Sequence, residues 1–213
     1  MNHNSSNVAL EIEAKYLGGS EEFTRVIGWF TGQGFDVERK SPTHRLHVYF
    51  DSESRLQNGG CRLRCIVAPG EWVRYDFKAD DPSGRRETLE ICQPLDEPIA
   101  LAQVVPGILD QLPEGPIRQV LDSTADALGI TLVMTGRHSK TLARRNDLEL
   151  ELSWDVLSAL DTGRRISEIE IEYISGSRGS FEVCVSRLER DLGLTQESRS
   201  KLDRMLAGSS KSL

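Results

Sequence analysis

The chain has 213 residues, and its 26 lysines and arginines against 33 aspartates and glutamates give a formal net charge of −7. That length suffices for one large domain or two small ones, and the acidic balance argues against a stable nucleic-acid partner. No apolar segment is long enough to span a membrane and residues 1–7 are polar, so we expect a cytoplasmic protein without a membrane partner.

The first predicted element is a strand over residues 8–17. Side chains alternate along a strand, so Glu11, Glu13 and Lys15 share one face, and the residues between them are apolar enough to pack on a core. The same pattern is typical of the solvated face of an antiparallel sheet, and that alternative stays open for this segment taken alone.

The segment from residue 20 to 94 predicts a helix followed by an antiparallel meander. The helix covers residues 20–32, and the strands cover 45–51, 61–67, 72–78 and 85–91. Arg62 and Arg64 share one face of the second strand, and Lys78 lies on the charged face of the third. Short turns rich in glycine and proline join the last three strands, which favours a meander.

The rest of the chain predicts a helical insertion, three more strands and two closing helices. The insertion covers about 94–130, with helices over 99–111 and 117–128; strands follow over 131–143, 147–155 and 166–174, and helices over 181–192 and 197–206. We expect a single domain over residues 1–213, with a frayed tail at about 208–213.

A second acidic strand face lies near the carboxyl end of the chain. Glu168, Glu170 and Glu172 alternate with apolar residues. Like charges gathered in a partly desolvated place oppose folding unless a cation neutralises them. Hard divalent ions such as Mg²⁺ and Mn²⁺ take carboxylate oxygens as ligands, so a metal site is one hypothesis and a solvated sheet face is the other.

Nearly all the predicted strands place charge on one face and apolar side chains on the other. The basic members are Lys15, Arg62, Arg64, Arg74, Lys78, Arg85 and Arg137. The pattern indicates an α+β fold with about eight antiparallel strands: an open sheet would leave the charges in water, whereas a sheet closed into an eight-stranded antiparallel β-barrel would have a charged lumen and helices packed outside. A lumen of this kind, with bases in surplus, suits a polyanion bridged by metal ions.

Several of these residues resemble the motifs of a known family. Glu11-x-Glu13-x-Lys15 resembles the ExExK signature of the CYTH superfamily, the triphosphate tunnel metalloenzymes. Further similarities are Arg62-Leu63-Arg64, Lys78, Arg85-Arg86-Glu87, Arg137, Glu168 to Glu172 and Ser200-Lys201, so that the resemblance runs from about residue 8 to 206. The basic cluster around Arg137 is thinner than is usual for the family.

The resemblance implies an eight-stranded tunnel that binds a small-molecule triphosphate and requires Mg²⁺ or Mn²⁺. It implies substrate binding by Lys15, Arg62, Arg64, Lys78, Arg85, Arg137 and Lys201, and catalytic roles for Lys15 and Glu13. It also implies metal ligation by Glu11, Glu13, Glu170 and Glu172, with Glu168 as an alternative to one of the last two. For the basic residues the alternative is cross-strand ion pairing with the glutamates. Homodimerisation is left open.

Three functions remain in competition at this point. The first is triphosphatase activity, with inorganic tripolyphosphate as the expected substrate and thiamine triphosphate as an alternative. The second is conversion of ATP to cyclic AMP and pyrophosphate, as in class IV adenylate cyclases; we find no clear base-recognition cluster for it. The third is a non-catalytic sensor of polyphosphate or nucleotide. The histidines His44, His47 and His138 are interpreted as bystanders, and the cysteines as small core residues.

Overall fold

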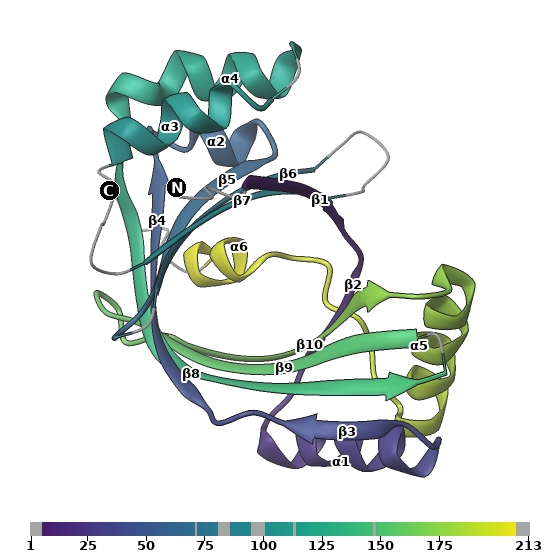
Figure 1. Cartoon of the computed structure of the whole chain (residues 1–213). Coiled ribbons are helices and arrows are strands. Elements are labelled where there is room, and N and C mark those ends of the chain that lie inside the picture. Colours follow the sequence, from purple (N-terminus) through teal and green to yellow (C-terminus); the bar gives the residue numbers. More distant parts are fainter. Residues whose placement is uncertain are drawn as a thin grey trace. The chain divides into compact units, whose positions relative to one another are not determined.

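The structure is a computed structural model that describes residues 6–70, 72–80, 86–94, 101–112, 114–146 and 148–207 (Figure 1). The chain divides into two compact units. The first comprises residues 1–11 and 45–135, and the second comprises residues 12–44 and 136–213. Two strands, β4 (Thr43–Asp51) and β8 (Gly129–Arg145), contribute residues to both units.

The first unit is an antiparallel sheet with three helices and a 3₁₀ turn. Its elements besides β4 and β8 are β1 (Ser6–Glu11), α2 (Arg55–Asn58), β5 (Cys61–Ala68), β6 (Trp72–Asp80), β7 (Arg86–Pro94), α3 (Leu101–Leu109), α4 (Pro116–Thr124) and a 3₁₀ helix (Ala125–Ala127). The strand order is β1-β7-β6-β5-β4-β8. The helices α2, α3 and α4 lie together in Figure 1.

The core of the first unit lies between the helices and the apolar face of the meander. Leu63 and Phe77 from β5 and β6 are buried in one cluster with Ile108 of α3 and Leu121 of α4. The alternation of apolar and charged residues along these strands therefore places the apolar side chains against the helices and the charged side chains on the opposite face, as predicted.

The second unit places its helices against the apolar face of a second part of the sheet. Its further elements are β2 (Glu13–Leu17), α1 (Ser20–Gly32), β3 (Asp36–Arg39), β9 (Leu148–Ala159), β10 (Arg165–Ser175), α5 (Arg178–Leu192) and α6 (Lys201–Leu206). The strand order is β8-β9-β10-β2, and β3 pairs with β8. Phe30 of α1 and Leu188 of α5 are fully buried against Ile169 and Ile171 of β10.

These strands confirm the predicted antiparallel architecture with helices on its apolar faces. Over the described residues the sheet is divided into ten strands, which are the eight predicted ones with the first divided in two and one short strand added. The predicted strand 8–17 is interrupted at Ile12, and the short strand β3 was not predicted. Among the described residues no hydrogen-bonded pairing joins β1 to β2, so the term barrel applies only loosely.

The predicted helices are present with shifted ends. The insertion holds α3, which ends at Leu109 rather than at residue 111, and α4, which ends at Thr124 rather than at residue 128; the last helix starts at Lys201 rather than at residue 197. Cys61, Cys65 and Cys184 are buried and form no disulfide among the described residues, as expected of core residues. Within the described ranges, no helix combines the length and the apolar character that crossing a membrane requires. The predicted tail at 208–213 lies outside the described residues.

Candidate active site

Three carboxylates form a row across the strands of the second unit. Glu172 of β10 is the register partner of Glu151 on β9 and of Glu13 on β2. Directly opposed residues of an antiparallel pair project from the same face at short range, where like charges repel. A lysine stands at each end of this acidic row: Lys15 Nζ lies 2.5 Å from Glu13 Oε1, and Lys140 forms an ion pair with Glu151. The row therefore attracts cations.

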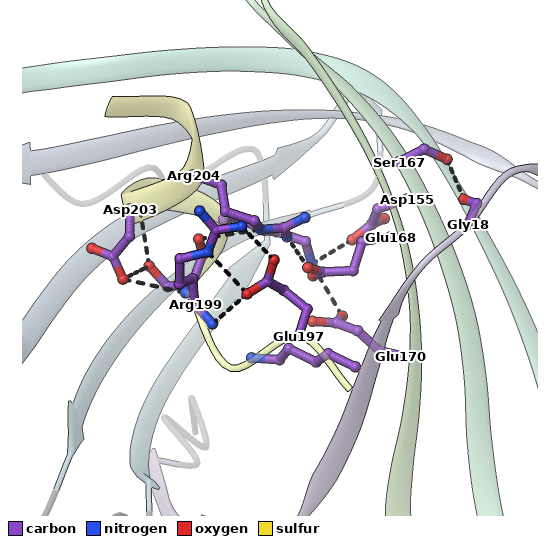
Figure 2. A network of polar contacts seen from close by, with 12 residues as sticks. Gly18, Asp155, Ser167, Glu168, Glu170, Glu197, Arg199, Asp203 and Arg204 are labelled. Atoms are coloured by element: carbon purple, nitrogen blue, oxygen red, sulfur yellow. Dashed lines mark hydrogen bonds and ion pairs between the residues drawn. The ribbon is translucent and has the colours of Figure 1, made fainter. Parts of the chain in front are cut away.

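A second group, here called the Lys201 cluster, comprises Asp155, Glu168, Glu170, Lys201 and Arg204. Lys201 Nζ lies 2.7 Å from Asp155 Oδ2, 3.1 Å from Glu168 Oε1 and 3.0 Å from Glu170 Oε2. Arg204 contacts Glu168 as well. Figure 2 shows the three carboxylates converging with Arg204 from α6. Glu168 is 0% exposed, so this charge is viable only because both cations meet it.

The helix α6 holds the two cations of this cluster in place. Ser200 caps its amino end by accepting a hydrogen bond from the backbone N–H of Asp203 at 3.0 Å, while the Asp203 carboxylate accepts one from the backbone N–H of Ser200. Such a capping box satisfies donors that a helix end leaves unpaired. At the other end, Arg164 donates to the carbonyl oxygens of Met205 and Arg204, at 2.6 and 3.2 Å. The short helix is therefore fixed at both ends.

In the first unit the charged face of the meander is dominated by basic side chains. Arg62 of β5 is the register partner of Lys78 on β6, and Arg64 is opposite Asp76. Asp76 is fully buried, with Arg64 NH2 2.6 Å from its Oδ2 and Arg74 Nε 2.8 Å from its Oδ1. Burial raises the pKa of Asp76, but Arg64, Arg74 and Lys78 together lower it to about 2. Asp76 thus stays ionised and orients the arginines.

Two of the predicted residues have incompletely described surroundings. Glu11 ends β1, where its register partner is Arg86, and Arg86 is in turn opposite Asp80 on β6. Arg85 lies outside the described residues.

The structure does not bring all the predicted residues of the second unit together. Glu13, Lys15, Glu170 and Glu172 lie on one face of β2 and β10. Arg137 is exposed and occupies the other face of its strand, because its neighbour His138 is the residue whose Nδ1 lies 2.7 Å from Asp155 Oδ1. Lys201 is buried among carboxylates rather than standing at the surface.

Sequence reasoning missed two residues that contact these carboxylates. Arg204 was not considered, and His138 was interpreted as a bystander, although both contact carboxylates of the Lys201 cluster. Lys201 and Arg204 are three residues apart, which puts them on one side of a helix. That spacing was the available signal for Arg204, whereas the contact of His138 depends on the register of β8 against β9.

The donor chemistry of the acidic row fits a hard divalent cation. Its oxygens are carboxylates on adjacent strands, and the ends are already occupied by cations. Among the residues that the structure describes, however, no group of three or more histidine, cysteine, aspartate or glutamate side chains is gathered closely enough to hold a metal ion. The side chain of Glu11, one of the predicted ligands, is not among them.

Solved structures with the same fold were found, whereas no protein-family model and no curated protein matches the chain. A candidate adenylate cyclase from Bacillus halodurans is 22% identical, with 92% of this chain and 97% of that chain covered and a TM-score of 0.58. HpAC1 from Hippeastrum, a candidate adenylyl cyclase described as having a dominant triphosphatase activity, is 17% identical over 93% and 96% of the two chains, with a TM-score of 0.56. A candidate adenylate cyclase from Vibrio parahaemolyticus is 13% identical over 93% and 99%, with a TM-score of 0.52. The chain has the fold of these proteins, which confirms the fold that the resemblance to the CYTH superfamily implied.

Proposed function

We propose that the protein is a metal-dependent triphosphatase that hydrolyses inorganic tripolyphosphate to phosphate and pyrophosphate. The observation that carries the proposal is the acidic row, in which Glu13, Glu172 and Glu151 oppose one another in register and require cations to coexist. The dominant triphosphatase activity stated for HpAC1, a protein of the same fold, supports the reaction class.

The residues of the second unit would hold the metal. Glu13 and Glu172 face each other across β2 and β10, and Glu170 lies one step further along the same face. With Glu11 these are the ligands that the sequence predicts. Bound Mg²⁺ or Mn²⁺ would polarise phosphate oxygens and lower the pKa of a bound water. Lys15, whose Nζ lies 2.5 Å from Glu13 Oε1, would donate to a phosphate oxygen.

The basic residues of the first unit would bind the phosphate chain. Arg62 and Lys78 are opposed in register, and the Asp76 carboxylate holds the guanidinium of Arg64. An arginine fixed in this way loses little freedom when it binds a phosphate oxygen. When water attacks the terminal phosphorus and its bond to the bridging oxygen breaks, these cations would stabilise the charge on the departing pyrophosphate.

The proposed preference for tripolyphosphate rests on the positions of the basic side chains. Lys15, Arg62, Arg64 and Lys78 all belong to strands, so recognition is concentrated on phosphate oxygens. A site of this kind gains little from an organic group beyond the phosphates. Strong discrimination requires buried polar groups that the wrong substrate leaves unpaired, and a bare triphosphate offers every oxygen that such cations need.

The test is a comparison of kcat/KM for tripolyphosphate, thiamine triphosphate and ATP at saturating Mg²⁺ or Mn²⁺. We expect the highest value for tripolyphosphate, one phosphate and one pyrophosphate per turnover, little activity on pyrophosphate, and no activity in excess chelator. Full turnover in chelator would remove the metal from the proposal. A preference of more than about tenfold for thiamine triphosphate, or ~1.4 kcal/mol of transition-state binding, would reassign the substrate.

The second candidate is an adenylate cyclase, which the descriptions of the Bacillus and Vibrio proteins favour. It differs in the nucleophile, because the ribose hydroxyl would attack the α-phosphorus and pyrophosphate would leave. A cyclic-AMP assay run on the same ATP reactions separates the two. The cytoplasmic location, the single domain and the homodimer remain predictions from the sequence.

A further inference from the structure

A cavity of about 260 Å³ opens on the helix-facing side of the second unit. Its lining comes from α1, from the end of β3 and the turn after it, and from β8 and β9. The lining residues relevant here are Phe23, Arg39, Lys40, Arg137, Ser139 and Trp154.

This cavity is separate from the candidate active site. On β9, Trp154 lines the cavity, whereas its neighbour Asp155 belongs to the Lys201 cluster. On β8, Ser139 lines the cavity, whereas its neighbour His138 contacts Asp155 from the other side. Successive side chains of a strand point to opposite faces. The cavity therefore lies across the sheet from Asp155, although Lys140, whose ammonium group pairs with Glu151, also contributes to its lining.

Two exposed arginines at the cavity, Arg39 and Arg137, have no ion-pair partner among the residues that the structure describes. Arg39 is the register partner of Thr141, which shares its face of β8 with Arg137. Over the described ranges, no ion pair or hydrogen bond engages either guanidinium, although most other basic side chains of the second unit are paired. No carboxylate is among the described residues that line the cavity.

The hydroxyl of Ser139 is a second, independent sign of a missing ligand. Ser139 is 8% exposed and lines the cavity, and its Oγ has no hydrogen-bond partner among the described residues. Buried polar atoms are nearly always satisfied, so an orphan that faces a cavity calls for a partner within that cavity. The partner must accept or donate a hydrogen bond beside two free guanidinium groups.

We propose that this cavity binds the phosphate group of a small anion. The guanidinium groups of Arg39 and Arg137 present paired N–H donors that match phosphate oxygens, and the Ser139 hydroxyl donates a further hydrogen bond. Phe23 and Trp154, whose rings stack with centroids 6.0 Å apart, supply an apolar wall beside the phosphate. The site is independent of the hydrolysis proposed above. It would give Arg137 a phosphate ligand on the face of β8 that points away from the candidate active site.

The experiment titrates inorganic phosphate into the full-length protein in excess chelator and follows heat and tryptophan emission. Wild-type protein should bind phosphate saturably. Arg39→Gln should weaken binding by about tenfold or more, since it removes a charge-assisted contact, and Ser139→Ala should weaken it by a smaller factor. Arg165→Gln, at an exposed arginine on β10 that is outside the cavity, is the matched control and should bind as the wild type does.

Two further measurements keep the outcome decisive. Lys15→Ala should leave phosphate binding intact, because Lys15 lies on the face of the sheet that carries the candidate active site. Competition by phenyl phosphate distinguishes a phosphate monoester from free phosphate, because its phenyl ring would contact the aromatic wall. Thermal melts of all variants must match the wild type. The proposal is overturned if wild-type protein shows no saturable binding, if Arg39→Gln and Ser139→Ala bind normally, or if Lys15→Ala abolishes binding. None of these readouts requires turnover.

Discussion

Substitution of Glu13 should affect catalytic activity far more than folding stability. Its carboxylate pairs with Lys15 and stands opposite Glu172. Glu13→Gln removes a predicted metal ligand but also relieves repulsion within the acidic row. We expect kcat to fall on the order of 10²-fold while the melting temperature stays within a few degrees of the wild type.

The matched control for this change is Glu182→Gln on the exposed face of α5, where Glu182 pairs with Arg178. Its activity should equal that of the wild type. Unchanged turnover in Glu13→Gln, with an intact melt, would remove Glu13 from the site.

Asp76 makes stability depend on pH in the acid range. Its pKa is lowered from 3.8 to about 2, chiefly by Arg64 against the opposing effect of burial. A lowered folded-state pKa contributes stability above pH 4, and that contribution, about 2 kcal/mol, is lost as the pH falls towards 2. We expect the difference in unfolding free energy between wild type and Asp76→Asn to shrink from pH 6 to pH 2. Urea midpoints measured along this series would contradict the assignment if the two curves ran parallel.

At the scale of the element, α6 depends on the ion pair between Arg204 and Glu168. Both side chains are buried, so Arg204→Met leaves Glu168 with Lys201 alone. We expect a loss of ~3–5 kcal/mol in unfolding free energy, because an uncompensated buried charge is costly. Combining it with Glu168→Gln should recover part of this loss. A double-mutant cycle in urea tests the coupling, and strict additivity of the two changes would rule out a direct pair.

Elements with one clean apolar face were predictable, and those with polar residues on both faces were not. In β10, Ile169 and Ile171 fixed which way the glutamates point. The segment around Arg137 has charged or hydroxyl side chains in both parities, so its orientation could not be derived from alternation. Gly136 also matters here, because a Cβ at this position would lie 1.9 Å from the carbonyl oxygen of Val156. The pattern of residues around Gly136 does not predict this close approach of the two strands.

The start of the last helix shows a similar limit. Residues 197–206 have helical composition throughout, yet α6 starts at Lys201. Ser200 and Asp203 form the capping box that sets this boundary, and Glu197 instead contacts Arg199 at 2.8 Å. The buried positions of Lys201 and Arg204 depend on where α6 starts, and the sequence placed that start four residues too early. The members of the Lys201 cluster could therefore be predicted only in part.

For the whole molecule, the prediction of a single domain has a calorimetric test. Strands β4 and β8 each contribute residues to both compact units, so neither unit consists of whole strands alone. We therefore expect one cooperative transition, with the calorimetric and van't Hoff enthalpies equal. Two resolved transitions would assign the units to separate domains.

The contacts of Lys201 also limit which side chain can occupy its position. An ammonium group carries three hydrogens in a tetrahedral arrangement, and three carboxylates, on Asp155, Glu168 and Glu170, lie within 2.7 to 3.1 Å of its nitrogen. An arginine would offer more hydrogens, but in one plane and on a bulkier group. We therefore expect that Lys201→Arg, which preserves the charge, does not preserve the three contacts, because a guanidinium group differs in shape and donor geometry.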